Sequence, residues 1–344
     1  MKVLAALSGG IDSSVALMLL KRMGYDLEAA TYQTTADTTA VREACAMAAA
    51  EGIAHHALDI RREFHESIIR YFIDEYLSGR TPNPCIVCNP TIKWGKLLEM
   101  ADSLGCCKIA TGHYARIGEN GGRYFVSMGC DTRKDQSYFL YRLTQEQLAR
   151  TIFPLGELTK TEVREIARAG GYYDLAEKTE SQEICFIPND DYRSFLRDNL
   201  PEGTIRPGNY IDSDGTILGR HEGYMNYTIG QRKGLKIAFG EPRYVTRLNA
   251  TTNEVTLGVK SELTSHECTI SDIIYQKWGG FDDGATVMAK YRYKTQAVPA
   301  RIYHNGEEVI VRFIGEADAI TPGQSVVCYD GEDIVLGGVI KKSL

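Results

Sequence analysis

The sequence has no stretch that approaches eighteen consecutive apolar residues, so no membrane-spanning helix is expected. Its first residues lack the charged, apolar and small-residue succession of a secretory signal peptide, and we therefore expect a cytoplasmic protein. Nine cysteines, an odd number in 344 residues, do not suit a secreted disulfide framework. In a reducing compartment most of them should be thiols, with a chosen few reactive or metal-bound.

Basic residues do not dominate the chain, whose net charge is −6. This balance argues weakly against a nucleic-acid partner, because neutralising phosphates requires Lys and Arg. A local basic face remains compatible with the sequence, since several basic residues fall near the motifs described below: Arg80, Lys93, Lys96, Arg133, Lys134, Arg232 and Lys233. No internal repeat or low-complexity tract is present, and the composition is that of a globular protein with ample core.

Residues 1 to about 115 alternate between strand-like and helix-like segments. Strands are expected at Val3–Leu7, Leu27–Tyr32, His56–Ile60 and Lys108–Thr111, and helices at Ser13–Met23, Thr39–Glu51, Glu63–Leu77 and Ile92–Leu104. This alternation predicts an α/β fold, a Rossmann-like doubly wound parallel sheet that binds ligands at the carboxyl ends of its strands. Thr159 and Glu162 form a capping box that predicts a further helix.

After about Pro201 the periodicity becomes that of short strands separated by Gly, Asn and Asp. We expect strands at Tyr244–Leu248, Glu254–Gly258, Thr286–Tyr293, Ala300–His304, Glu308–Phe313, Ser325–Tyr329 and Ile334–Ile340. Two small β-rich domains should therefore follow the parallel sheet, with joints near 206–209 and 260–266. The predicted domains are 1–200, 201–262 and 263–344.

The phosphate-binding motif Gly-x-x-x-x-Gly-Lys-Ser/Thr is absent. Leu7–Val15 instead reads Leu-Ser-Gly-Gly-Ile-Asp-Ser-Ser-Val, between an expected strand and an expected helix. Two glycines and the unpaired N–H groups of a helix start allow the backbone to approach an anion. The simpler alternative is a glycine turn with Ser or Asp as a helix cap. The motif resembles the pyrophosphate loop of enzymes that split ATP into AMP and pyrophosphate and adenylate a carbonyl-type oxygen.

Gly79–Pro90 contains three prolines and the pair Cys85 and Cys88, which predicts a stiff loop. A Cys-x-x-Cys is typical of half a zinc or iron–sulfur site, of a redox dithiol, or of accidental spacing. The sequence has no second Cys-x-x-Cys that would complete a four-cysteine site. Cys185 lies between Ile184 and Phe186, and by itself it would be interpreted as a buried core residue.

Seven motifs, in this order and spacing, resemble the tRNA-specific 2-thiouridylase (MnmA) family along nearly the whole chain. They are the pyrophosphate loop, Thr81–Pro84 with Cys88–Asn89 and Ile92–Lys93, Ala110–Arg116, Lys134–Leu140, Glu183–Phe186, Tyr227–Leu235, and Arg292–Tyr293 with Pro322–Gln324. The resemblance implies a pyrophosphatase domain of the adenine nucleotide α-hydrolase type, a central tRNA-binding domain and a C-terminal β-barrel.

The resemblance also implies the reaction, 2-thiolation of the wobble uridine of tRNAs for Lys, Glu and Gln. ATP adenylates uracil O2, Cys185 carries a persulfide obtained from a sulfur-donor or relay protein, and Cys88 then closes a disulfide with Cys185. ATP is assigned to Ala6, Leu7, Ser8, Gly9, Gly10, Ile11, Asp12, Ser13, Ser14, Tyr32 and Gly112, with Asp12 holding the Mg²⁺. A thiolate is needed at both sulfur steps.

Asn83, Pro84 and Cys85 should contact the target base, which must leave its stack to react. The tRNA-contact positions implied by the resemblance are His113, Lys134, Asp135, Gln136, Arg292, Tyr293 and Gln324. Arg232 and Lys233 suit phosphate contacts because they follow a glycine near Tyr227. Simpler alternatives are a strand-end cap for His113, a solvated turn for Lys134 and Asp135, and a charged loop for Arg232 and Lys233.

Two departures from the family pattern leave alternatives open. Some members carry Asp, thought to be the general acid or base, where this chain has Cys85, and the segment after Tyr32 is short. Cys85, Cys88 and Cys185 are also enough thiols for a 4Fe–4S cluster with one open iron. The remaining rivals are another pyrophosphate-loop enzyme, such as an amidotransferase-type or lysidine synthetase, and a non-catalytic RNA-binding module.

Overall fold

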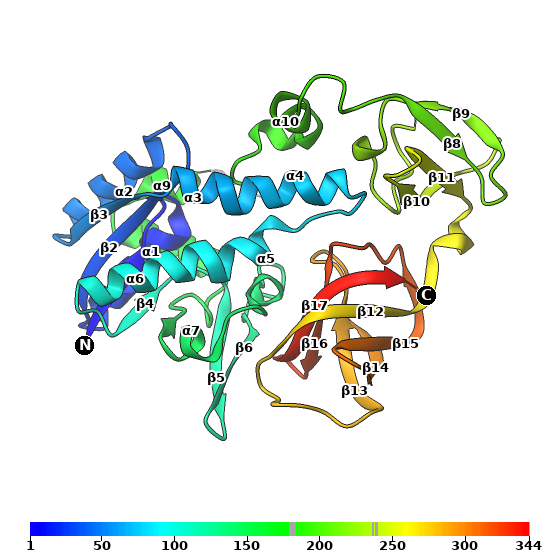
Figure 1. Cartoon of the computed structure of the whole chain (residues 1–344). Helices are drawn as coiled ribbons and strands as arrows, with labels where there is room; N and C mark the ends of the chain where they lie inside the picture. The colour runs from blue at the N-terminus through cyan, green and yellow to red at the C-terminus, as the bar shows by residue number, and fades with distance from the viewer. Residues whose placement is uncertain (179–183, 236, 238–239, 344) are drawn as a thin grey trace.

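The computed structural model describes residues 1–178, 184–235, 237 and 240–343 (Figure 1). Its first layer is a five-stranded parallel sheet of order β3-β2-β1-β4-β7. The strands are β1 (Lys2–Ala6), β2 (Asp26–Gln33), β3 (Ala54–Asp59), β4 (Lys108–Ala110) and β7 (Thr151–Ile152). The predicted parallel α/β sheet is therefore confirmed, with β1 at its centre.

Helices cover both faces of this sheet because successive side chains of β1 point in opposite directions. Leu4 packs against Leu97 of α6 (Gly95–Ser103), whereas Val3 and Ala5 pack in the cluster that contains Leu17 of α1 (Ile11–Arg22). The other helices of this part are α2 (Thr39–Ala50), α3 (Arg61–Phe64), α4 (Arg70–Leu77), α5 (Pro84–Cys88), α7 (Gln145–Ala149), α8 (Lys160–Ala169), α9 (Tyr173–Glu177) and α10 (Tyr192–Asn199). Short π segments at His65–Ile69 and Asn89–Trp94 and 3-10 turns at Ser137–Leu140 and Pro188–Asp190 complete it.

The expected strands and helices before residue 115 all form, with ends displaced by a few residues. The predicted loop from Gly79 to Pro90 is wrong in its second half, because the chain is helical from Pro84 onward through α5 and the following π segment. Pro84 occupies the first turn of α5, where a missing N–H costs nothing and the fixed φ favours helix. The capping box of Thr159 and Glu162 at the start of α8 is confirmed.

The rest of the chain forms two β structures, as predicted. A four-stranded central sheet has the order β10-β11-β8-β9, from β8 (Gly208–Ile211), β9 (Ile217–His221), β10 (Tyr244–Asn249) and β11 (Glu254–Gly258). A barrel is closed by pairing of β12 with β17, from β12 (Thr264–Tyr275), β13 (Ala285–Lys290), β14 (Val298–Asn305), β15 (Glu308–Asp318), β16 (Ser325–Asp330) and β17 (Asp333–Ser343). Two 3-10 turns lie at Tyr224–Asn226 and Lys260–Leu263. β12 begins inside the segment expected to be a joint near 260–266.

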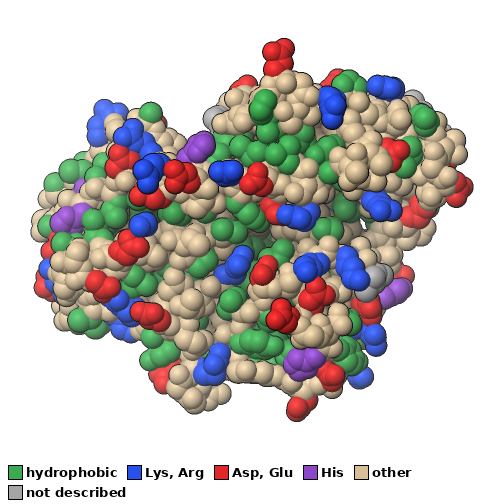
Figure 2. All heavy atoms as spheres, in the orientation of Figure 1, with side chains coloured by type: hydrophobic (Ala, Val, Ile, Leu, Met, Phe, Trp, Pro, Cys, Tyr) green, Lys and Arg blue, Asp and Glu red, His purple; other side chains and the backbone are tan. Residues whose placement is uncertain are grey.

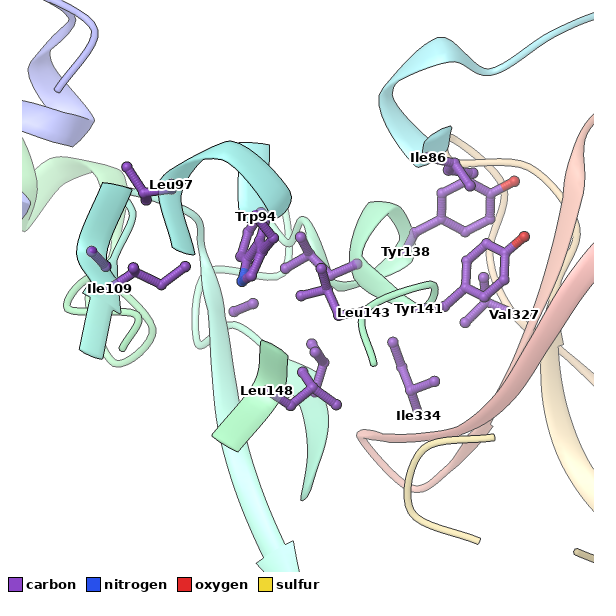
Figure 3. Packing of buried hydrophobic residues seen from close by; sticks show 14 of the residues in the cluster. Ile86, Trp94, Leu97, Ile109, Tyr138, Tyr141, Leu143, Leu148, Val327 and Ile334 are labelled. Atoms are coloured by element: carbon purple, nitrogen blue, oxygen red, sulfur yellow. The ribbon is translucent and has the colours of Figure 1, made fainter. Parts of the chain in front are cut away.

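The barrel is joined to the α/β part of the chain by a shared apolar core. A hairpin of β5 (Ala115–Asn120) and β6 (Arg123–Met128) extends the barrel sheet at the pair Asp333 and Ser127. Figure 3 shows Ile86 of α5 and the rings of Tyr138 and Tyr141 beside Val327 and Ile334 of the barrel. Burial of these side chains fixes the barrel against the helix that carries Cys85 and Cys88.

In the described part of the chain, none of the helices is long and apolar enough to span a membrane.

Candidate active site

The loop between β1 and α1 has the geometry of an anion site. Gly10 is the residue before α1 and has no side chain with which to cap the helix, so the first N–H groups are available to a ligand. The Ser13 hydroxyl donates to the Gly10 carbonyl oxygen (3.0 Å) and accepts from the Ser8 N–H (3.1 Å). Ser14 also bonds to the Gly10 carbonyl oxygen (3.0 Å). These bonds hold the loop in a fixed shape before any ligand binds.

Two glycines of the site are required by their surroundings. Gly9 has φ +74°, a conformation that L side chains rarely adopt, and a Cβ there would lie 2.9 Å from Glu43. A Cβ on Gly112 would lie 2.8 Å from the Asp12 carbonyl carbon and from the Ser13 backbone nitrogen. Gly112 at the end of β4 therefore packs directly against the loop that follows β1, as the strand order requires.

Asp12 is held by two partners that are distant in sequence. The Lys160 ammonium lies 2.6 Å from Asp12 Oδ1, and the Tyr114 hydroxyl donates to the same oxygen at 2.7 Å. Lys160 is 7% exposed and begins α8, where its backbone N–H donates to Asp131 (3.1 Å). The sequence motifs did not reveal this buried lysine beside the loop. The capping box beside it predicted a helix start but no role for Lys160.

The three thiols of interest lie near one another. Cys85 and Cys88 are one turn apart on α5, with Cys85 partly exposed and Cys88 buried. Phe186 and Ile184, the neighbours of Cys185, belong to the same apolar cluster as Cys88. Cys185 itself is exposed, so the interpretation of it as a core residue is wrong. Glu183 of this motif lies outside the described residues.

The positive charge of Lys93 acts on both Cys88 and Cys185. Burial raises the pKa of Cys88 to about 12, and the Lys93 charge opposes that shift. Surrounding protein atoms also raise the pKa of the Cys185 thiol, although the side chain reaches solvent, and Lys93 again acts in the opposite direction. Each thiol is also affected by Cys85, which places all three within electrostatic range of one another. The raised pKa values favour the protonated thiol forms of Cys88 and Cys185. The positive charge of Lys93 would stabilise a thiolate at either residue.

Tyr32 and His113 connect the phosphate loop to the thiol side. Tyr32 lies at the carboxyl end of β2, and its hydroxyl donates to the Lys93 carbonyl oxygen (2.5 Å). His113 follows Gly112 and packs against Trp94 (ring centroids 5.4 Å apart). Burial holds the pKa of His113 well below its usual value, and the nearby Lys93 adds to this shift. His113 is therefore an uncharged imidazole at neutral pH.

The predicted tRNA-contact residues fall into an exposed group and a group with internal partners. Arg232 and Lys233 are exposed, and Lys134 is partly exposed. Asp135 is buried and accepts hydrogen bonds from the backbone N–H groups of Gly129 and Ser137. On the face drawn in Figure 2, Lys and Arg are interspersed with Asp and Glu.

The other four make contacts across the fold. Gln136 accepts from the Tyr114 N–H, and Arg292 donates to the Ile229 carbonyl oxygen of the central part (2.9 Å). The Tyr293 ring packs on the Phe139 ring, with ring centroids 4.3 Å apart. The Gln324 side-chain amide donates to the carbonyl oxygens of Thr81 and Pro82, just before Asn83. Contact with tRNA stays a prediction for all of these residues.

The side chains of the crevice fit magnesium delivered with ATP better than a resident metal. Mg²⁺ at nucleotide sites is held by one or two carboxylates together with substrate phosphates, and Asp12 supplies one carboxylate beside the loop. Within the described residues, no group of three or more His, Cys, Asp or Glu side chains is placed to hold a metal ion. A 4Fe–4S cluster on Cys85, Cys88 and Cys185 stays an alternative that the iron-dependence of thiolation decides.

Fold and site together define a HUP-type nucleotide-binding enzyme domain joined to two β structures. Family models match residues 1–189 (tRNA methyl transferase HUP domain), 193–259 (tRNA methyl transferase PRC-barrel domain) and 265–340 (aminomethyltransferase beta-barrel domain). The chain is 44% identical to the tRNA-specific 2-thiouridylase MnmA of Desulfitobacterium hafniense, over 98% of both chains. It is 44% identical to that of Amoebophilus asiaticus, over 99% of this chain and 96% of the relative. The chain belongs to the tRNA-specific 2-thiouridylase family.

Proposed function

We propose that this chain catalyses ATP-dependent 2-thiolation of the wobble uridine in tRNAs for Lys, Glu and Gln. The observation that carries the proposal is the link between the two groups: Gly112 packs on the pyrophosphate-type loop, Tyr32 bonds to the Lys93 carbonyl oxygen, and the Lys93 charge acts on Cys88 and Cys185. The matching family models are described in terms of methyl transfer. Three thiols in one crevice supply the nucleophiles for sulfur transfer, which the alternative pyrophosphate-loop synthetases do not need.

In the first half of the reaction, uracil O2 attacks the α-phosphorus of ATP and pyrophosphate leaves. The loop from Ala6 to Ser14 and Gly112 bind the phosphates, while Tyr32 packs the adenine. Asp12 would hold the magnesium that arrives with ATP, and that ion would neutralise phosphate charge. Lys160 lies beside the loop, paired with Asp12, and we assign its positive charge to the departing pyrophosphate.

In the second half, sulfur replaces the activated oxygen. A persulfide donor transfers its outer sulfur to Cys185, which is exposed enough to be reached, and the donor leaves as a thiol. The terminal persulfide sulfur attacks C2 of the adenylated base. Cys88 then attacks Cys185 Sγ, so the S–S bond between Cys185 and the transferred sulfur breaks and a Cys88–Cys185 disulfide forms. The sulfur stays on C2, and AMP departs with the former O2. An external thiol must reduce that disulfide before the next turnover.

The remaining residues bind the tRNA and present the base. Asn83, Pro84 and Cys85 precede or begin α5 and contact the extruded uridine. Arg232, Lys233 and Lys134 contact phosphates, while His113 and Tyr293 offer uncharged rings for packing and hydrogen bonding. Asp135, Gln136 and Arg292 shape the surfaces beside these contacts. We propose that residues 1–200 catalyse the reaction, that residues 201–262 bind tRNA and that residues 263–344 form the barrel. We also propose that the enzyme is cytoplasmic.

Loss of the protein from its cells should remove 2-thiouridine from the wobble position of these three tRNA groups. The expected result is complete loss where no second copy of the enzyme exists, because no other step supplies sulfur to O2-activated uracil. Nucleoside analysis by mass spectrometry measures it, with other thiolated positions in the same tRNAs as the internal control. Unchanged wobble thiolation contradicts the proposed function.

Alkylation of Cys88 in the free protein should be slow and should accelerate steadily with pH. Because burial raises its pKa to about 12, the thiolate fraction rises about tenfold per pH unit between about pH 7 and about pH 10, without a plateau. Iodoacetamide labelling followed by peptide mass spectrometry measures the rate at Cys88, with exposed Cys45 as the reference in the same protein. A plateau near pH 8 would contradict the buried, unactivated thiol.

A further inference from the structure

The connection between α4 and α5 (residues 78–83) leads directly into α5, the helix that carries Cys85 and Cys88. Residues of the central part and of the barrel hold this connection in place. At its start, the Tyr224 hydroxyl of the central part donates to the Leu77 carbonyl oxygen (2.6 Å). A Cβ on Gly79 would lie 3.5 Å from Ala250, also in the central part. The connection is therefore packed against the central part of the chain before it reaches Asn83 and α5. Figure 1 shows it between α4 and α5, on the side of the barrel.

The barrel contacts the other end of this connection through three hydrogen bonds. The Gln324 side-chain amide donates to the carbonyl oxygens of Thr81 (2.9 Å) and Pro82 (3.1 Å). The Thr81 N–H donates to the Pro322 carbonyl oxygen (3.0 Å). Both donor positions of the Gln324 amide group face two consecutive carbonyls, immediately before Asn83, Pro84 and Cys85.

The barrel side of this contact is rigid. The Gly323 N–H donates to the Ile340 carbonyl oxygen (3.0 Å), and the Ile340 N–H returns a bond to the Gln324 carbonyl oxygen (2.8 Å), so both residues are tied to β17. Gly323 has φ +90°, and a Cβ there would lie 2.9 Å from the Thr81 carbonyl oxygen. Backbone therefore approaches backbone at this point, and only glycine permits it.

We propose that Gln324 is a positioning residue through which the barrel sets the location of the base-contact residues and of Cys88. The inference rests on the proposed function, in which Asn83–Cys85 meet the uridine and Cys88 attacks Cys185. Loop residues place reacting groups accurately only when a rigid element supports them. Here the support comes from a part of the chain more than two hundred residues away. The barrel thereby acts on the chemical step as well as on tRNA binding.

The test uses full-length Gln324→Ala, Gln324→Glu and Gly323→Ala. The first removes the two donated bonds, the second keeps the side-chain length but turns a carboxylate toward two carbonyl oxygens, and the third forces the backbones apart. Gln296→Ala, an exposed glutamine of the barrel, is the matched control for the first two. Gly306→Ala is the control for the third, since it has φ +64° with open space around it.

The first measurement is alkylation of Cys88 in the absence of ATP and tRNA. Each Gln324 and Gly323 variant should raise the rate about fivefold or more relative to the controls, because a loosened connection exposes a buried thiol. Thermal melting that matches the control variants shows that the barrel remains folded. An unchanged Cys88 rate in all three variants overturns the positioning role.

The second measurement is single-turnover thiolation at saturating tRNA. We expect the rate to fall about tenfold to a hundredfold in the Gln324 variants, with the tRNA dissociation constant changed less than about threefold. A raised dissociation constant with a normal rate at saturation would instead make Gln324 a tRNA contact and overturn the proposal. If the wild-type protein thiolates no tRNA, the proposed function fails, and the alkylation result still decides whether Gln324 positions Cys88.

Discussion

Cys185→Ser and Cys88→Ser are each expected to lower single-turnover thiolation of tRNA by at least about a thousandfold, because a serine hydroxyl neither carries a persulfide nor closes a disulfide. The two variants should stop at different points. Cys185→Ser accepts no sulfur, whereas Cys88→Ser still accepts it and accumulates a Cys185 persulfide. ATP–pyrophosphate exchange stimulated by tRNA should persist in both variants, since neither thiol belongs to the phosphate loop before α1.

Mass spectrometry of the protein after incubation with a persulfide donor separates these outcomes. Cys106→Ser is the matched control, because Cys106 is also buried but lies in the segment after α6 and away from the crevice. Thiolation that survives in either Cys88→Ser or Cys185→Ser would remove that residue from the mechanism.

Cys85→Asp distinguishes persulfide transfer from the cluster alternative with the same assay. Aspartate at this position keeps a group able to exchange protons but removes a cluster ligand. Under the persulfide mechanism the variant, purified in air and without iron, should retain thiolation within about tenfold of wild type. Activity that depends on anaerobic reconstitution with iron and vanishes in Cys85→Asp would establish the cluster instead.

Local signals in the sequence were sufficient to predict the glycine turn between β1 and α1 that the structure shows. Gly9, Gly10, Asp12 and Ser13 could be selected from the sequence because the glycine pair, the Asp and the two serines all fall at one strand–helix junction. Their neighbours Tyr32 and Gly112 followed from topology, since parallel strands present their carboxyl ends at one edge. The fold class came from the same periodicity, which depends on burial of alternate faces and can be seen without any long-range contact.

The features that sequence reasoning missed depend on contacts between distant segments. Lys160 meets Asp12 across 148 residues, and nothing near Lys160 indicates an anionic partner. Gln324 reaches Thr81 across 243 residues, and its side chain looks like that of any polar residue before a strand. The sequence analysis did not predict β12 because the first residues of this strand are polar. Its apolar residues Cys268 and Ile270 are buried only once β12 pairs with β15 and β17 and closes the barrel.

Lys160→Met is expected to reduce tRNA-stimulated ATP–pyrophosphate exchange by about a hundredfold to a thousandfold. Pyrophosphate leaves with several negative charges, and a fixed cation near the departing group stabilises that charge in the transition state. Methionine keeps the length and apolar stem of the side chain but not the ammonium. Lys160→Arg should recover part of the activity, since the charge is retained while the packing beside Tyr114 changes.

Asp12→Ala should give a similar loss, and the double variant should lose less than the sum of the two, because the two side chains act as one unit. Lys21→Met on the far end of α1, where the lysine is exposed and pairs with Glu51, is the matched control. The affinity for tRNA should stay within about twofold of wild type in every variant, since tRNA binds chiefly through its own phosphates elsewhere on the surface. If Lys160→Met leaves pyrophosphate exchange at the wild-type rate, the lysine merely neutralises a buried aspartate and the assignment to the leaving group is wrong.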